Sequence, residues 1–441
     1  MSENTPFASA WREDTIRSIV DPSRPITYGV VQPGTRLDQG VPIIRGQDYS
    51  GGLVDDSDLY LIHPTIAASY KRSAVKGGDI IFSIVGYLGQ TAIVPEHLSG
   101  ANITQTTARI AVKHPYLSRF FLQQFRSENF AAEVRRCKKG SAQPGLNLAD
   151  VEKMKVVIPL PEDQSRIAAV LDTVDEAIAK TEAVIAKLRQ VRAGLLQDLL
   201  TRGLDNHGQL RDPIAHPEQF QDSPLGQIPN DWAVKAVSKL ITGFESGVSV
   251  DSFDVPVAEG EIGVLKTGCV TGGIFNLQEN KRVKKEDLSR VCCNPKADSL
   301  LISRMNTPQL VGESAYVPTS YSHVFLPDRL WQTLKLPGDP TCIQWLGYVI
   351  QSKEFREAIT GGATGTSGSM KNISQNFFLG LPVRVPPRAE QEKIVAIAIK
   401  QDAALAAEQK AHDKMVQLKS GLMTDLLTGR VRVPEPIGAK S

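Results

Sequence analysis

The sequence predicts an α+β protein in which two mixed α/β domains are separated by a pair of long antiparallel helices, a coiled coil, within an internal pseudo-two-fold duplication. Three observations support this fold class. One helix-like segment occurs twice, each copy has apolar residues at helical spacing, and short β-rich runs with glycine and proline turns precede each copy.

The duplication is clearest where the segment beginning at Pro159 aligns, without a gap, with the segment beginning at Pro386. Fifteen of the forty-three aligned residues are identical. Fainter matches precede it: Trp11 pairs with Trp232, and PIIRGQDYSGGLV around Arg45 pairs with IGVLKTGCVTGGIF around Lys266. We therefore interpret the chain as two copies of one unit, each a variable region followed by a helix.

Glu162–Leu200 has apolar residues every three or four positions, which is typical of an amphipathic helix. Such a helix spans roughly 58 Å at 1.5 Å per residue. Helices of this length usually pair, and the nearest partner is Glu390–Leu427, antiparallel if the two copies are related by a pseudo-two-fold axis. The alternative is two unrelated surface helices, each on its own domain. The residues predicted for helix pairing or partner docking are Ile167, Val174, Leu188, Leu195, Ile394, Met415 and Leu422.

The variable regions contain short runs typical of strands and, in each half, one helical stretch. The predicted strands are Asp79–Val85, Gln90–Val94, Ala108–Val112, Ser299–Ile302 and Ala315–Val317, and the helical stretches are Leu117–Glu133 and Cys342–Ile359. The expected organisation is a first domain at 1–158, a first helical region at 159–203, a linker at 204–225, a second domain at 226–385 and a second helical region at 386–433.

The composition excludes several classes of protein. With 41% hydrophobic residues, 22% charged residues and a net charge of +2 over 441 residues, the chain is neither disordered nor a polybasic nucleic-acid coat. Five cysteines without C-x-x-C spacing favour reduced thiols over a disulfide framework or a zinc site. The N-terminal residues do not resemble a signal peptide, and no apolar run is long enough to span a membrane. We expect a cytoplasmic protein without membrane partners.

Motifs for an active site are missing from the sequence. There is no G-x-x-x-x-G-K-[ST] phosphate loop, no G-x-G-x-x-G dinucleotide fingerprint and no paired histidine cluster. The Pro-Pro pair at Pro386 and Pro387 lacks the aromatic residue of an adenine methyltransferase motif. We therefore predict no catalytic residues and no metal site in this chain.

Local charge indicates nucleic-acid binding, because each half has one basic segment and, next to it, a small polar loop. The loops are KKGSAQPGLN and GGATGTSGSMKN, in which glycine and serine permit close backbone approach and amides can read base edges. The other interpretation is two solvated faces with flexible loops. The predicted DNA-binding residues are Arg45, Arg135, Arg136, Lys138, Lys139, Ser141, Gln143, Asn147, Lys266, Lys281, Arg282, Lys284, Lys285, Arg304, Lys371 and Asn372.

These features together resemble the specificity subunit of type I restriction-modification enzymes. The resemblance lies in the V-x-(I/V)-P-x-(P/R)-x-(D/E)-Q pattern at Val156–Gln164 and Val383–Gln391, the leucine-rich helix ends at Leu195–Thr201 and Leu422–Thr428, and SPLGQIPNDW at Ser223–Trp232. It covers essentially the whole chain, whereas the variable regions match only in outline.

The resemblance implies a non-catalytic subunit with two target recognition domains that bind a bipartite, asymmetric site in double-stranded DNA, with a spacer set by the helices. It also implies two modification subunits that carry S-adenosylmethionine and the adenine methyltransferase site, and restriction subunits that use ATP and Mg²⁺ for translocation and cleavage. The alternatives are a coiled-coil scaffold or assembly adaptor that does not read DNA, which the low net charge favours, and an enzyme with an unrecognised site.

Overall fold

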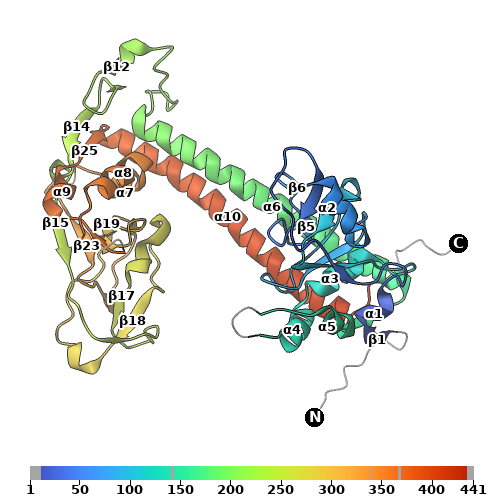
Figure 1. Ribbon diagram of the computed structural model, residues 1–441. Helices are drawn as coiled ribbons and strands as arrows, with labels where there is room; N and C mark the ends of the chain where they lie inside the picture. Colours follow the sequence, from blue (N-terminus) through green and yellow to red (C-terminus); the bar gives the residue numbers. More distant parts are fainter. Residues whose placement is uncertain (1–10, 141–143, 339, 366–368, 435–441) are drawn as a thin grey trace. The chain divides into compact units, whose positions relative to one another are not determined.

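The computed structural model describes residues 11–140, 144–338, 340–365 and 369–434. The chain divides into two compact units, Met1–Val184 with Glu408–Ser441, and Ile185–Ala407. Both predicted long helices are present, as α6 (Pro161–Thr201) and α10 (Arg388–Leu427), and each contributes one part to each unit (Figure 1). Among the described residues, no helix is long and apolar enough to cross a membrane.

The first unit contains a four-stranded antiparallel sheet of order β2-β10-β7-β8 and a three-stranded sheet of order β6-β3-β9, in which β3 and β9 are parallel. Strand β1 pairs with β11, the strand that leads into α6. The strands are β1 (Arg12–Thr15), β2 (Thr27–Tyr28), β3 (Val41–Ile44), β4 (Tyr49–Ser50), β5 (Leu53–Val54), β6 (Tyr60–Ile62), β7 (Ile80–Ser83), β8 (Thr91–Ile93), β9 (Asn102–Ile103), β10 (Thr107–Ile110) and β11 (Lys155–Ile158). The helices are α1 (Ile16–Ile19), α2 (Pro64–Ser69), η1 (Lys71–Ser73), η2 (Glu96–Leu98), α3 (Ser118–Phe125), α4 (Glu128–Cys137) and α5 (Leu148–Lys153).

The second unit has a four-stranded antiparallel sheet of order β15-β23-β19-β21 and a sheet of order β16-β18-β17-β22, in which β17 and β22 are parallel. Its strands are β12 (Phe220–Gln221), β13 (Ile228–Pro229), β14 (Ala233–Ala236), β15 (Ile241–Ser246), β16 (Ser252–Phe253), β17 (Gly263–Leu265), β18 (Asn280–Val283), β19 (Ser299–Ser303), β20 (Met305–Asn306), β21 (Ser314–Val317), β22 (Val324–Phe325), β23 (Leu330–Lys335), β24 (Lys371–Asn372) and β25 (Pro382–Val385). Its helices are η3 (Pro217–Gln219), η4 (Val237–Lys239), η5 (Thr267–Gly273), η6 (Lys285–Asp287), α7 (Ile343–Gln351), α8 (Lys353–Gly362) and α9 (Gln375–Gly380).

The two units have corresponding strand pairings. The order β2-β10-β7-β8 in the first corresponds to β15-β23-β19-β21 in the second, and the pair β1–β11 corresponds to β14–β25. In both units two helices follow the four-stranded sheet, then a short helix, then the strand before the long helix. The mixed α/β content that the sequence predicts is therefore present in both units.

The five predicted strands are confirmed as β7, β8, β10, β19 and β21, but the prediction of one helical stretch per half is wrong. Each stretch is two helices, α3 and α4 in the first unit and α7 and α8 in the second. Ser127 and Ser352 lie at the breaks in extended conformation, and their side chains accept hydrogen bonds from the backbone N–H groups of Phe130 and Phe355. A serine in this position caps a new helix N-terminus and so ends the preceding one.

The core of each unit includes the end of the long helix from the other repeat. Leu426 and Leu427 of α10 are buried with the residues of the first unit, whereas Leu199 and Leu200 of α6 are buried with those of the second. Gly203 follows α6 with a φ of 62°, a left-handed conformation that glycine adopts without strain. The leucine-rich motif therefore completes a core.

Within each unit the two long helices run antiparallel. In the first unit, Asp175 of α6 contacts Lys419 of α10, and Glu182 contacts His412. The residue number rises along α6 as it falls along α10, so the helices run in opposite directions. In the second unit, Arg192 of α6 forms an ion pair with Asp402 of α10.

A buried glutamine explains the repeated sequence pattern at the start of each long helix. The Oε1 atom of Gln164 accepts a hydrogen bond from the N–H of Leu117 at 3.0 Å, and its Nε2 atom donates to the carbonyl of Pro159 at 2.9 Å. Gln391 makes the same two contacts, with the N–H of Cys342 at 2.8 Å and the carbonyl of Pro386 at 2.9 Å. The glutamine thus joins α3 or α7 to the helix that follows its domain.

A second repeated contact involves a tryptophan and a carboxylate. In the first unit, Trp11 Nε1 donates to Asp163 at 3.1 Å. In the second, Trp232 Nε1 donates to Glu390 at 3.0 Å, and Arg211 binds the same carboxylate at 2.8 Å. Because Trp11 and Trp232 precede the variable regions and the carboxylates begin the long helices, each contact joins the two ends of one variable region.

Candidate nucleic-acid interface

In the first unit, the predicted basic segment, Arg119 to Lys139, spans α3 and α4, and its last cations lie at the exposed end of α4. Arg135 and Arg136 pair with Glu128 and Glu133, each at 2.6 Å, in contacts on the protein surface. Lys138 is exposed and caps the helix C-terminus. Exposed ion pairs of this kind stabilise a protein by at most about 1 kcal/mol, so a DNA phosphate can compete for these cations.

The polar loop after α4 is closed at its base. The backbone groups of Lys139 and Gly145 exchange hydrogen bonds of 3.0 and 2.9 Å, and Leu146 N–H donates to the carbonyl of Ile84 at 2.8 Å. Asn147 caps α5 through its Oδ1 atom, which accepts from the N–H of Asp150, and its Nδ2 group is left to donate to other partners. The predicted residues Ser141 and Gln143 lie outside the described residues.

The corresponding loop of the second unit has the same closure. Thr364 and Asn372 exchange backbone hydrogen bonds of 2.9 and 2.8 Å, and β24 pairs with β20. Ile373 N–H donates to the carbonyl of Arg304 at 3.0 Å. The structure therefore brings Arg304, Lys371 and Asn372 together, although Arg304 is distant from the other two in sequence. The buried Oδ1 atom of Asn372 has no hydrogen-bond partner among the described residues.

The other predicted cations of the second unit lie on and around β17 and β18. Lys266 and Lys281 share the carboxylate of Asp254, at 3.1 and 3.5 Å, and the hydrogen bond from Lys266 is the main cause of the lowered pKa of Asp254. Two lysines on one carboxylate leave a net positive charge. Lys285, at the start of η6, is exposed.

Arg282 and Lys284 lie above an exposed aromatic ring. Their charged groups are 5.1 and 5.8 Å from the ring centre of Phe253, which is 48% exposed, and each also pairs with a carboxylate, Glu261 at 3.0 Å and Asp251 at 3.3 Å. Exposed aromatic side chains beside cations are a feature of surfaces that bind single-stranded nucleic acid, and the two cations can also contact the phosphates of a duplex.

Arg45 is held at two points by one carboxylate. Its Nε and Nη2 atoms bind both carboxylate oxygens of Asp48, at 2.9 and 2.8 Å, and its guanidinium lies 5.5 Å from the ring centre of Tyr60. This two-point contact fixes the side chain, so Arg45 offers a defined orientation rather than a flexible charge.

The first unit also contains a basic cavity that was not predicted from the sequence. It has a volume of about 910 Å³, and its cationic lining residues are Arg24, Lys71, Arg72, Lys76 and Arg109. Lys71, Arg72 and Lys76 are exposed, and no ion pair joins them to a carboxylate of the described residues. The short KRSAVK run was the available signal.

Arg109 forms the buried floor of this cavity. It is 3% exposed and donates to the carbonyls of Arg72, Ala74 and Pro25, at 2.6, 3.1 and 3.0 Å, and burial lowers its pKa. These bonds fix the loop that carries Lys71 and Lys76. The carboxylates that line or contact this region are Asp79, which is paired with Arg24, and Glu96. The cavity therefore has a net positive charge.

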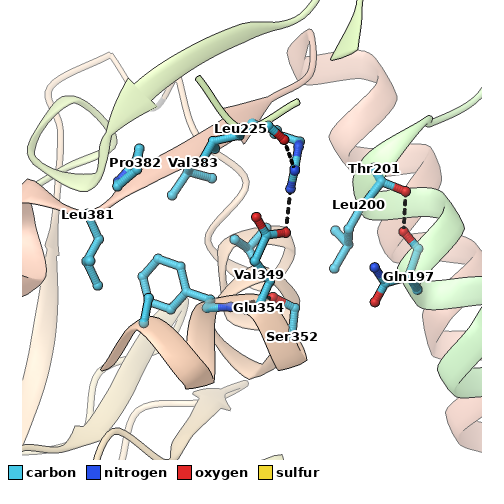
Figure 2. Close-up of a pocket in the computed structure, with 13 residues that line it drawn as sticks. Gln197, Leu200, Thr201, Leu225, Val349, Ser352, Glu354, Leu381, Pro382 and Val383 are labelled. Carbon is cyan, nitrogen blue, oxygen red and sulfur yellow. Dashed lines mark hydrogen bonds and ion pairs between the residues drawn. The ribbon is translucent and has the colours of Figure 1, made fainter. Parts of the chain in front are cut away.

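A different pocket lies in the second unit, where the end of α6, the helices α7 and α8, and β25 meet (Figure 2). Its lining is largely apolar, with Leu200, Val349 and Val383 among the residues. Its charged groups bind one another: Arg384 donates to Glu354 at 2.6 Å and to the carbonyl of Leu225. Through these two contacts, Arg384 of β25 links the segment around Leu225 to α8. No cluster of side chains that could bind a metal occurs among the described residues.

The residues predicted for helix pairing or docking fall into two groups. Ile167 and Ile394 are buried in the cores of their own units, with Leu422 and Leu195 packed against those same cores. The remaining predicted residues, Val174, Leu188 and Met415, are half-buried on the long helices.

Comparison with known proteins finds similarity to type I restriction-modification specificity subunits. The profile described as type I restriction modification DNA specificity domain matches residues 35–190. A putative type I restriction enzyme MjaX specificity subunit of Methanocaldococcus jannaschii is 23% identical over 435 residues, covering 95% of this chain and 93% of that one. The EcoBI specificity subunit of Escherichia coli is 32% identical over 188 residues, covering 41% of this chain and 40% of that one. This chain is similar to a type I restriction-modification specificity subunit over 95% of its length, and its residues 35–190 match the DNA specificity domain of such subunits.

Solved structures agree in fold. A chain from a study of complex assembly and conformational transition of the type I R-M system has a TM-score of 0.55 at 16% identity and covers 97% of this chain. The S subunit from M. genitalium has a TM-score of 0.55 at 13% identity and covers 99%. The matched residues 35–190 include Arg45, Arg135 and Arg136 of α4, and the cavity residues from Lys71 to Arg109.

Proposed function

We propose that this chain is the DNA sequence-specificity subunit of a type I restriction-modification complex and that it binds a bipartite, asymmetric target, with one half-site for each recognition domain. The observation that carries this proposal is the pair of matched loops, closed by Lys139 and Gly145 in one unit and by Thr364 and Asn372 in the other. The loops share their closure but differ in side chains, which suits two different half-sites.

The long helices are proposed to form an antiparallel coiled coil that sets the spacer between the half-sites. The corresponding strand orders, and the antiparallel contacts of α6 with α10 within each unit, support a pseudo-two-fold arrangement. We place the domain limits at 1–158 and 226–385, the helical regions at 159–203 and 386–433, and the linker at 204–225. Half-site spacing follows from such geometry.

Exposed apolar side chains on the long helices favour docking of other subunits. They are Val184, Val416 and Leu418 in the first unit and Val191 and Ile399 in the second. We propose that two modification subunits dock on the helical regions and bring S-adenosylmethionine and the adenine methyltransferase site. Restriction subunits would bring ATP- and Mg²⁺-dependent translocation and cleavage. In this proposal the chain itself is non-catalytic and works in the cytoplasm.

The experiment is to express the chain with its modification partner and sequence the methylome of the host. We expect methylated adenines at a single bipartite sequence with a fixed spacer. Methylation that is independent of sequence, or that depends on one contiguous site, would refute the proposal.

Charge substitutions then separate phosphate contacts from base reading. Lys284→Ala and Lys285→Ala are expected to weaken binding to all duplexes alike. For each lysine removed, the slope of the logarithm of the binding constant against the logarithm of the salt concentration should become about one unit less steep. We expect the same from Lys71→Ala and Lys76→Ala in the basic cavity, with Lys180→Ala on the exposed face of α6 as the control. A loss confined to one sequence variant would instead indicate base reading.

A coiled-coil scaffold without a DNA role is the second candidate. It is favoured by the carboxylate partners of most predicted cations and by the net charge of +2. Retention on duplex DNA at low salt, with and without the modification partner, distinguishes the two: a scaffold would elute with unbound protein in both cases.

A further inference from the structure

In each unit, one carboxylate joins the recognition domain to both long helices. In the first unit, Asp175 of α6 accepts from Lys419 of α10 at 2.5 Å. Its other oxygen accepts from Gln123 of α3 and from Arg126 at the end of α3, both at 2.8 Å. Three separate elements therefore meet at one side chain.

The second unit has the same junction at the positions that the duplication aligns. Asp402 of α10 corresponds to Asp175, and Arg192 of α6, which corresponds to Lys419, forms its ion pair. The hydroxyl of Tyr348, on α7, donates to the other carboxylate oxygen at 2.8 Å. Tyr348 lies five residues after the start of α7, as Gln123 lies five residues after the start of α3. Different side chains at equivalent positions therefore bind the two carboxylates.

The partners from the recognition domains and Lys419 are shielded from water, whereas the side chains of Asp175 and Asp402 remain 27% and 38% exposed. Gln123, Tyr348 and Lys419 are 1%, 7% and 9% exposed. Burial is the main cause both of the raised pKa of Tyr348 and of the lowered pKa of Lys419. Hydrogen bonds to charged groups are stronger than those between neutral groups, and the buried donors Gln123 and Tyr348 have few other partners to turn to.

The junction supplies a second attachment point on α3 and on α7. The first is the N-terminal end of each helix, which Gln164 or Gln391 binds. The residue bound by the carboxylate lies six residues further along, or about 9 Å along a helix. Two attachments at this separation fix the direction of α3 or α7 relative to the long helices, whereas one alone would allow rotation.

We propose that Asp175 and Asp402 are positioning residues that orient each recognition domain on the helix pair and thereby set the distance between the two half-sites that the protein accepts. This inference rests on the function proposed above. In this view, the range of spacer lengths that the protein accepts depends on the two junctions as well as on the length of the helices.

The junctions differ in strength. In the first unit Gln123 also donates to Asp172 at 2.8 Å, and Arg119 pairs with Asp172. In the second unit the position of Asp172 is taken by Ile399, and Gln351, in the place of Arg126, donates to the carbonyls of Gly273 and Ser314 instead. The second junction has fewer contacts, so it is the one that a single substitution should loosen.

The test uses two variants of the complete complex with its modification subunits. Tyr348→Phe keeps the ring and removes the hydroxyl, whereas Tyr348→Gln sacrifices ring packing but installs the donor that the first unit uses. The measured ratio is methylation of targets with the correct spacer divided by methylation of targets whose spacer is one base pair longer or shorter. We expect Tyr348→Phe to lower this ratio by about tenfold, which corresponds to about 1.4 kcal/mol. Tyr348→Gln should retain more of this ratio than Tyr348→Phe, with the half-site bases unchanged.

A merely structural role gives the opposite order, because phenylalanine preserves packing better than glutamine. Tyr321→Phe is the matched control, since the Tyr321 hydroxyl makes no hydrogen bond with a described residue. Hydrogen exchange of Ile343–Gln351 reports on the junction independently of DNA. Faster exchange in Tyr348→Phe with an unchanged spacer ratio would overturn the inference. A wild-type complex without a bipartite target would refute the proposed function instead.

Discussion

The buried glutamine at the start of each long helix gives the sharpest test of the fold. Gln164 is fully buried, and we expect Gln164→Met, which keeps the shape of the side chain, to leave the carbonyl of Pro159 without its buried donor and the N–H of Leu117 without its acceptor. An unsatisfied buried group costs about 1–3 kcal/mol. Leu117 is partly exposed, so water can replace its lost partner at a cost of about 1 kcal/mol.

The free energy of unfolding of the first unit should therefore fall by about 2–4 kcal/mol, a large part of the 5–15 kcal/mol typical of a domain. Urea unfolding followed by hydrogen exchange measures each unit separately. Gln391→Met should have the same effect on the second unit alone, and Gln190→Met, at an exposed position of α6, should have little effect. A loss below about 0.5 kcal/mol in both buried variants would refute the reasoning.

Two further predictions concern buried charges. Arg211→Met should destabilise the second unit by about 3–5 kcal/mol in urea unfolding, because it leaves the buried carboxylate of Glu390 without its cation; the double variant with Glu390→Gln should recover part of the loss. In the first unit, burial raises the pKa of Asp175, but hydrogen bonds from Gln123 and Lys419 and the charge of Arg126 outweigh it and lower the pKa below 3.8. Its stabilisation is thus complete above the unfolded-state pKa and lost as the pH falls through the folded-state pKa. The urea midpoint of the first unit should drop on acidification below about pH 4, and Asp175→Asn should reduce this drop; equal drops in both proteins would contradict the assignment.

Local patterns predicted the long helices because their apolar spacing persists over ten turns or more. The two breaks at Ser127 and Ser352 were missed because the apolar pattern continues through them, whereas the break depends on one serine side chain that caps a new helix. Serine is tolerated inside a helix as well as at its start, so the residue type alone did not decide between the two.

The candidate site was predicted less well, since its geometry depends on residues distant in sequence. The basic cavity combines Arg24, Lys71 and Arg109, which come from three separate segments. Likewise, the carboxylate that Lys266 and Lys281 share belongs to Asp254, beyond the end of a neighbouring strand. The charges along the chain located the basic segments. They did not show which surfaces have more cations than carboxylates, because the carboxylate partners come from other parts of the chain.

The unit of duplication is not the unit of folding. The first core is completed by Leu426 and Leu427, which belong to the second repeat, and the second core by Leu199 and Leu200 of the first. A buried leucine replaced by alanine costs about 2–5 kcal/mol. Leu427→Ala should therefore destabilise the first unit, although this residue ends the second repeat, while Leu200→Ala should destabilise the second unit.

The matched control is Leu418→Ala on the exposed face of α10, which should change neither unit by more than about 0.5 kcal/mol. Hydrogen exchange of the strands β7 and β19 during urea unfolding assigns each loss to its unit. If Leu427→Ala loosened β19 rather than β7, each repeat would have to contain its own complete core. The reciprocal exchange of helix ends would then have no energetic role, and the leucine-rich ends would need another explanation.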